Sequence, residues 1–439
     1  MNLVAAVEEL VTQAVALDRL PDEVTDHIGL VFADCVGAMA AGARTDEIAA
    51  LAADPVLRLG GTPTPEAGIR TLTARRRYGD PATVAWLNGT AGTFLELDEG
   101  FRPTGHPAIH VVAAALAMAE RTGAPGTDLA AAVAAGYEVA ARLFECFALP
   151  AAMHPHGHFG ALGAATAVAR LTGADPVALV RIAATQPLLT GWDACYEGAT
   201  ARNTWSGHAN RVGVLALALH RAGFTGSLAS HLSVVAPYAA RPAVLAEPVT
   251  ARGLRIRRNY FKLHSACALN HSALDAFTRA WEGLRTKDPA AVEAIEVTTV
   301  TANLRIDRLP AHNALSTRFS LPYALAAAAL TGGTGPESFT WRPEVADYAG
   351  RVTVRADPAM DARWPASAPA RVVVRTAAEI VEATVDNPRG HHADPVTRAV
   401  LRDKFTGLLG APHAPCFDRL ADLREVADCA ALALPYDEV

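Results

Sequence analysis

The sequence predicts a mainly α-helical protein, with a large all-helical domain and a smaller α+β lid domain inserted late in the chain. Two observations lead to this fold class. Apolar residues, many of them Ala, recur at helical spacing along most of the chain before Thr250. After Pro248, several short segments instead alternate β-branched and polar residues, which is the pattern of half-buried strands.

The helical part is expected to consist of stacked helical hairpins. Apolar residues lie at helical spacing from Leu3 to Val15, and after a break at Pro21 a second helix is expected over Val24–Ala41. No GxGxxG or Walker loop occurs here, so a doubly wound nucleotide-binding fold is not expected. Three further helices should each end at a C-cap glycine, with a new helix start soon after; these glycines are Gly123, Gly173 and Gly223.

The α+β part is expected to hold a small antiparallel or mixed sheet. An apolar helix is predicted at Pro322–Leu330, between the strand-like segments. Those strand-like segments are Val292–Ala302, Arg351–Ala356, Arg371–Thr376 and Glu379–Asp386.

The end of the chain is expected to return to the helical domain, because a helical pattern begins at Asp394 and continues to Leu409. We therefore predict a helical domain formed by residues 1–255 and 395–439, and an α+β lid domain formed by residues 256–394.

Composition excludes several classes of protein. With 439 residues, a formal charge of −6 and a mildly acidic pI, the chain lacks the basic face of a nucleic-acid-binding protein. No uninterrupted apolar run reaches the roughly 18 residues of a membrane span. The first ten residues contain Glu8 and Glu9 and no basic region, unlike a secretory signal. The six scattered cysteines form no framework, and we expect a cytoplasmic protein.

The run His154-Pro-His156-Gly-His158 is the first candidate for chemistry. Alternate histidines could converge on a metal ion, as in a metal-dependent hydrolase completed by Lys262 and His271. They could instead be loop histidines bonded to the backbone. As a third alternative, an imidazole at the start of a helix suits a site that binds anions and moves protons.

The second candidate is the loop from Glu96 to His106, which concentrates acids, an arginine and a histidine before an apolar helix. Arg102 could hold a substrate carboxylate by two hydrogen bonds, and His106 could act as base or acid. The alternative is a charged turn in contact with solvent.

Further polar residues lie among small apolar ones later in the chain. Arg202 and Asn203 lie between two apolar helices, and Lys262 and His271 flank the start of another. Tyr323 heads the expected helix of the α+β part and could be a phenolic donor. Such a set of cations and histidines, without a cofactor motif, suits the binding of small polycarboxylates and proton transfer next to a carboxylate.

At this point the sequence resembles the MmgE/PrpD family, which includes 2-methylcitrate dehydratases, cis-aconitate decarboxylases and iminodisuccinate epimerases. The resemblance runs in order from about Leu30 to Leu409. The matching motifs are Asp34-x-x-Gly37, Ala85-Trp-Leu-Asn-Gly-Thr90, Glu96-x-Asp98, His106-Pro107, His154-Pro155, Phe159-Gly160-x-x-Gly163, Ala222-Gly-Phe-Thr-Gly226, Tyr260-Phe-Lys262 with His271, Phe319-Ser-x-Pro-Tyr323, and Asp394-Pro395 with Lys404-Phe405.

The resemblance implies an all-helical domain formed by both chain ends, an α+β lid, a site between the domains, a homodimer, and no metal or organic cofactor. In the decarboxylase branch, the matching site positions with the same residue type are His106, His154, Lys262 and Tyr323. The sequence departs from that branch at three positions, with Glu96 for Asp, Gly100 for Thr and Arg202 for Lys.

We therefore predict a cofactor-independent lyase that moves a proton at the carbon α to a carboxylate of a small di- or tricarboxylate, by dehydration or decarboxylation. The alternatives are an epimerase or isomerase of an iminodisuccinate-like dicarboxylate, and a non-catalytic relative that binds a metabolite. The predicted catalytic residues are His106, His154, Lys262 and Tyr323, and the predicted substrate-binding residues are Glu96, Arg102, Arg202, Asn203 and His271. No metal, nucleic acid or membrane partner is expected.

Overall fold

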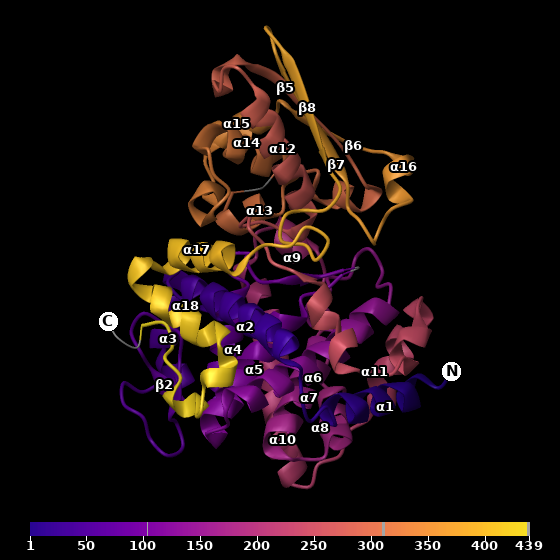
Figure 1. Ribbon diagram of the computed structural model, residues 1–439, viewed down its shortest axis with the longest axis vertical. Helices are drawn as coiled ribbons and strands as arrows, with labels where there is room; N and C mark the ends of the chain where they lie inside the picture. Colours follow the sequence, from indigo (N-terminus) through magenta and orange to yellow (C-terminus); the bar gives the residue numbers. More distant parts are fainter. Residues whose placement is uncertain (103, 310–311, 437–439) are drawn as a thin grey trace.

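The computed structural model describes residues 1–102, 104–309 and 312–436. Helices dominate, and one small sheet lies in the C-terminal half, so the predicted mainly α-helical fold is confirmed. Figure 1 shows the sheet and its helices standing above a larger helical body.

The helical body is built from long helices that pack closely through small residues. A Cβ on Gly136 would lie 2.5 Å from the carbonyl oxygen of Gly163, and one on Gly207 would lie 2.3 Å from that of Trp86. Only glycine permits helices to approach this closely. The main helices are α1 (Leu3–Val15), α2 (Asp22–Gly42), α4 (Pro81–Gly92), α5 (Pro107–Thr122), α6 (Gly126–Cys146), α7 (Gly160–Thr172), α8 (Pro176–Ala183), α10 (Thr204–Arg221) and α11 (Leu228–Val235).

The C-terminal helices α17 (Arg398–Leu409) and α18 (Ala414–Ala421) lie against α2, as Figure 1 shows. Phe405 and Leu420 share one apolar core with Phe32 of α2. The C-terminal helices therefore pack on the helical body. The helix start predicted at Asp394 is wrong, because the carbonyl of Asp394 accepts from Gly390 N–H in a turn and the helix begins only after its N-cap, Thr397.

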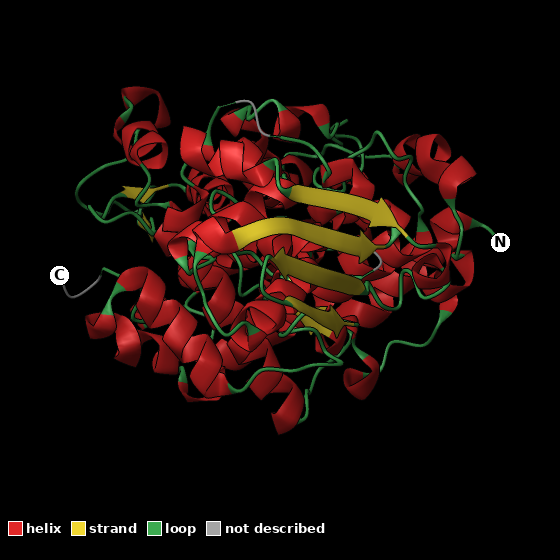
Figure 2. Cartoon of the chain, turned by 90° about the horizontal axis from the view of Figure 1, so that it is seen from above, coloured by secondary structure: helices red, strands yellow, loops and turns green. Residues whose placement is uncertain are grey.

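The sheet has four strands in the order β6 (Val352–Ala356), β5 (Val292–Thr299), β7 (Ala370–Thr376) and β8 (Ile380–Val385). β5 is parallel to β6 and antiparallel to β7, and β7 is antiparallel to β8, so the sheet is mixed (Figure 2). The strand predicted to reach Ala302 ends at Thr299, because Thr301–Ile306 turns into a 3₁₀-helix. Helices α12 (His271–Gly283) and α14 (Leu321–Thr331) share an apolar core with the sheet.

Two short strands join the two parts of the molecule. β3 (Gly100–Phe101) pairs antiparallel with β4 (Asn259–Tyr260), with Gly100 opposite Tyr260. The loop between α4 and α5 is thereby held at the junction. The domain boundaries at residues 255 and 395 stay a prediction, which the separate core of the sheet part supports.

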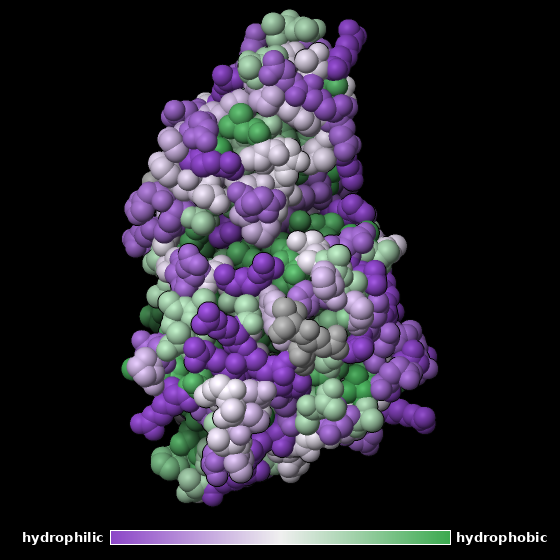
Figure 3. Space-filling model, turned by 90° about the vertical axis from the view of Figure 1, so that its left-hand side faces the viewer, coloured by the Kyte–Doolittle hydropathy of each residue, from purple (hydrophilic) through white to green (hydrophobic). Residues whose placement is uncertain are grey.

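One helix, α2, is long and apolar enough to cross a membrane by length and composition, but 83% of its most apolar window is buried within the protein. That burial is typical of a core helix in a soluble globular protein. On the face shown in Figure 3, hydrophilic residues cover both parts of the molecule, and apolar residues reach the surface between them.

Candidate active site

A cavity of about 430 Å³ lies between the helical body and the sheet part. The helical body supplies the loop after α4, the segment 147–155 and Arg202. The other part supplies Arg305, Phe319 and Trp364. Two of the predicted acid–base residues, His106 and His154, line this cavity.

One wall of the cavity holds a buried charge network centred on Glu96. This residue has a left-handed backbone, with φ at 53°, which is uncommon for a side chain of this kind and turns its carboxylate inward. Its Oε1 accepts from Arg202 Nη1 at 2.6 Å, and its Oε2 accepts from Lys262 Nζ at 3.2 Å. Lys262 also donates to Asp98 Oδ1 at 3.3 Å.

These ion pairs determine the ionisation states of Lys262 and Asp98. Burial by itself would lower the pKa of Lys262, but Asp98 and Glu96 more than offset it, so that pKa lies above its usual value. Burial would likewise raise the pKa of Asp98, yet Lys262 and His106 hold it well below its usual range. Lys262 and Asp98 therefore both stay charged.

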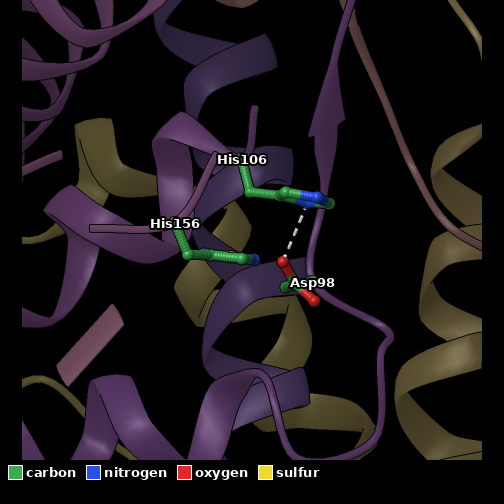
Figure 4. A group of neighbouring side chains, drawn as sticks. All are labelled: Asp98, His106 and His156. Atoms are coloured by element: carbon green, nitrogen blue, oxygen red, sulfur yellow. Dashed lines mark ion pairs between the residues drawn. The ribbon is translucent and has the colours of Figure 1, made fainter. Parts of the chain in front are cut away.

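His106 is the N-cap residue of α5, and its Nδ1 faces two acceptors. The nitrogen lies 2.7 Å from the carbonyl oxygen of Glu99 and 3.0 Å from Asp98 Oδ2 (Figure 4). The hydrogen bond goes to the nearer carbonyl, and the carboxylate becomes an ion-pair partner only when the ring is protonated. Because neither oxygen can donate, Nδ1 carries the proton and Nε2 is the nitrogen that can accept one.

Three imidazoles are stacked at the cavity wall, two of them lining it. The ring of His156 lies between those of His106 and His154, with centroid distances of 4.7 and 4.9 Å and interplanar angles of 10° and 11°. His110 holds the middle ring, since its Nε2 lies 2.9 Å from Nδ1 of His156. Nδ1 of His110 donates to the carbonyl of His106, so His110 must accept from His156. Burial lowers the pKa of His110 to about 4 and that of His156 well below its usual value, so both are neutral.

The stacking of these rings argues against the hypothesis that the histidines converge on one metal ion. Asp98, His106 and His156 each offer a ligand atom, all within 4.8 Å of one another. A metal ion lies in the plane of an imidazole that binds it, and two nearly parallel stacked rings cannot both meet that condition. His158 is outside the stack and lies against Phe159. The geometry of the described histidines therefore does not favour convergence of the His154–His158 run on one ion.

The tautomer of His154 is set by its backbone contact. Its Nδ1 accepts from the backbone N–H of His156, so the neutral ring carries its proton on Nε2, which lies 3.2 Å from Nη2 of Arg202 and cannot accept from it. Burial, together with the charge of Arg202, holds the pKa of His154 well below its usual value. His154 is therefore neutral and cannot serve as an imidazolium acid in this state.

Arg102 differs from the other buried cations of the site. Two of its guanidinium nitrogens, Nε and Nη2, are buried without a hydrogen-bond partner among the described residues. The group stacks on Trp364 at 5.1 Å from the ring centroid and on Tyr260 at 5.9 Å. The side chain as a whole is half-buried, and a guanidinium in a cavity wall with two buried, unpartnered nitrogens is suited to an incoming carboxylate.

The structure brings five of the nine predicted site residues to the cavity wall: Glu96, Arg102, His106, His154 and Arg202. Lys262 and Asn203 lie behind that wall, where they bond to Glu96 and Arg202 respectively.

The remaining two predicted residues do not reach the cavity wall. His271 bonds to the backbone of Ala266, and its ring lies 6.0 Å from that of Tyr260. The hydroxyl of Tyr323 donates to the carbonyl of Thr340 and accepts from the N–H of Arg342. Because Tyr323 packs within the core of the sheet part, the geometry does not support the donor role predicted for it.

Three residues of the site were not predicted. Asp98 lies beside His106, His156 fills the space between the two cavity histidines, and Tyr260 lines the cavity. Asp98 lies two residues after Glu96, and Tyr260 lies two residues before Lys262, each within the same sequence motif. This closeness to predicted site residues was the signal that could have identified both.

The comparisons agree with this architecture. Residues 10–233 match the MmgE/PrpD N-terminal domain, and residues 264–423 match the MmgE/PrpD C-terminal domain. The chain therefore belongs to the MmgE/PrpD family, and this membership supports an enzymatic, dehydratase- or lyase-like function at the level of the family. No curated protein matches the chain.

Proposed function

We propose that this protein is a lyase that removes a proton from the carbon α to a carboxylate of a small di- or tricarboxylate. The observation that carries the proposal is the pairing, in one cavity, of an oriented histidine with an uncompensated guanidinium. His106 has its Nδ1 bound and its Nε2 free, and Arg102 has two buried nitrogens without partners among the described residues.

In the proposed reaction, Arg102 binds a carboxylate of the substrate and His106 Nε2 accepts the α-proton. The imidazolium that forms is stabilised by the carboxylate of Asp98, which lies 3.0 Å from Nδ1. Lys262 keeps Asp98 ionised for this task, since its ammonium lies 3.3 Å from the carboxylate.

Charge that develops on the substrate carboxylate is stabilised from the other side of the cavity. Arg202 is fixed by Glu96 and Asn203 and keeps Nε–H without a partner among the described residues. A donor that is positioned before the reaction costs little reorganisation when charge develops. The proton held by His106 then goes to the leaving hydroxyl, which completes a dehydration.

The alternative outcomes use the same groups in other steps. In a decarboxylase, Arg102 would bind one carboxylate, another would leave as CO₂ with the bond's electron pair kept on the carbon, and a protonated His106 would supply the proton that completes the product. In an epimerase, His106 would take the α-proton and a proton from solvent would be added to the opposite face of the carbon. We further propose that the protein works without a cofactor, as a cytoplasmic homodimer. The near-parallel stacking of the described rings of His106, His156 and His154, which does not suit a shared metal ion, supports the metal-free part of that proposal.

Proton NMR in D₂O tests the function, with the wild-type protein and a panel of C4–C7 di- and tricarboxylates. The expected result is loss of an α-proton signal together with new alkene signals for one member of the panel. Exchange without alkene favours the epimerase. Binding of a panel member without any exchange contradicts the proposed lyase.

A further inference from the structure

The proposed reaction gives no role to Tyr260, whose ring packs against Gly100 where strands β3 and β4 pair. The two residues face each other in the β3–β4 pair. A Cβ built on Gly100 would lie 2.1 Å from Cε1 of Tyr260 and 2.5 Å from its Cζ. The phenol ring therefore occupies the space that any side chain at position 100 would need, and only glycine permits this ring position.

The hydroxyl of Tyr260 takes part in no hydrogen bond with the described residues. The side chain is 2% exposed and lines the cavity, and its hydroxyl oxygen is buried without a hydrogen-bond partner among the described residues. Burial raises the pKa of Tyr260 well above its usual value, so the phenol keeps its proton and can donate. Buried polar groups of this kind normally have a partner.

The unpaired donors of Arg102 lie next to the same ring. The guanidinium carbon is 5.9 Å from the ring centroid of Tyr260 and 5.1 Å from that of Trp364, which belongs to the opposite part of the molecule. No ion pair joins Arg102 to an acidic side chain among the described residues. One guanidinium and one phenol O–H therefore lie close together in the cavity wall, and no acidic side chain among the described residues pairs with either.

We infer that Tyr260 and Arg102 together form a subsite for one carboxylate of the substrate, the one that lies away from the reacting carbon. Gly100 is part of this subsite because a side chain at position 100 would displace the Tyr260 ring. This inference rests on the proposed function, which supplies the reacting carbon. The subsite selects substrates with at least two carboxylates, since one must occupy it while another lies beside the carbon that reacts.

Isothermal titration of the full chain with glutarate and with tricarballylate tests the subsite. Tyr260→Phe removes only the hydroxyl, and we expect it to bind both acids about tenfold more weakly than wild type, the usual scale for one hydrogen bond to a charged group. Its Tm should not fall, because the lost hydroxyl has no protein partner among the described residues. Tyr348→Phe is the matched control: its hydroxyl donates to the carbonyl of Pro289, outside the cavity, and binding should be unchanged.

A second variant tests the role of position 100. Gly100→Ala keeps every polar group, but its Cβ displaces the Tyr260 ring, so it should weaken binding like Tyr260→Phe. Binding by Tyr260→Phe equal to wild type would overturn the subsite and leave the proposed reaction standing. Weakened binding by Tyr260→Phe, combined with no α-proton exchange in wild type, would support the subsite and contradict the reaction. Failure of wild type to bind either acid would overturn both.

Discussion

At the scale of single residues, two buried cations of the site are held in ion pairs, while Arg102 has no ion pair among the described residues. Arg202 and Lys262 are matched by Glu96 and Asp98, at distances of 2.6 to 3.3 Å. Unpaired buried charges are costly, so these pairs fix the side chains in place. In the proposed function Arg102 meets the substrate, and its position in the cavity wall shows how a chain with a net charge of −6 can place a cation in a cavity.

Asp98→Asn should lower kcat about a hundredfold or more, with little change in KM. The amide keeps the shape of the carboxylate but removes the charge that stabilises the His106 imidazolium, and general acid–base catalysis is worth about 10²–10⁴-fold. Steady-state kinetics on the substrate found in the NMR panel measures both constants. Asp307→Asn, at an exposed site in the sheet part, is the control; a similar loss there would count against the role of Asp98.

Glu99 gives the protein a pH dependence of stability. This carboxyl accepts from Ala108 N–H and the Tyr137 hydroxyl, and burial raises its pKa to about 8 from an ordinary value near 4.5. Between these two values the folded state holds a proton that the unfolded state has lost. The contribution of Glu99 to stability is therefore complete below pH 4.5 and is lost as the pH rises to about 8.

Glu99→Gln should remove this dependence, because the amide resembles the protonated carboxyl. Urea unfolding from pH 5 to pH 8 should show the variant gaining on wild type by up to about 1.4 kcal/mol per pH unit. Parallel curves for the two proteins would contradict the assignment.

At the scale of elements, the C-terminal helix α17 anchors the loop that carries Glu96 and Asp98 of the proposed site. Lys404 donates to Asp34 of α2 at 2.7 Å and to the carbonyl of Leu97 at 3.0 Å, so one side chain ties two helices to the segment that holds Glu96 and Asp98. The pair is almost completely buried. Removal of one member leaves the other charged and unpaired.

Lys404→Met should lower the free energy of unfolding by about 3 kcal/mol and reduce kcat as well, because the loop loses its tether. Lys287→Met, at an exposed position, is the matched control and should change neither quantity. Urea unfolding and turnover measured on the same samples check this. A loss of stability with kcat intact would show that α17 supports the fold but not the loop.

The sequence predicted the ends of helices well where a capping glycine or aspartate determines the backbone conformation. Gly123 and Gly173 end their helices in the left-handed conformation, and Asp175 caps α8 through two backbone N–H groups. The errors fall at segment ends. Asp394-Pro395 resembles a helix start in sequence. In the structure, however, the carbonyl of Asp394 accepts from Gly390 N–H in a turn, and the local sequence pattern does not predict that contact.

At the scale of the whole molecule, the site depends on contacts between distant segments. Arg202 meets Glu96 across 106 residues and Lys262 meets the same carboxylate across 166. The motifs indicated which loops matter, but not which side chains face the cavity. Tyr323 illustrates the limit: its place at the head of an apolar helix suited a donor, yet tertiary packing pairs its hydroxyl with Thr340 and Arg342.

A polycarboxylate should stabilise the protein, because its cavity draws residues from both parts of the molecule. A ligand at a hundred times its Kd adds about 2.7 kcal/mol to the stability of the folded state. We expect Tm to rise by a few degrees with tricarballylate and much less for Arg102→Gln. Equal rises in the two proteins would contradict the binding role of Arg102.

The central claim is that His106 removes an α-proton, and deuterium exchange into the substrate in D₂O tests it most directly. Proton NMR should follow rapid loss of the α-proton signal with wild type and a rate at least a hundredfold lower with His106→Ala. His220→Ala, at the end of α10, serves as the control and should match wild type. Exchange by His106→Ala at the wild-type rate would contradict the account.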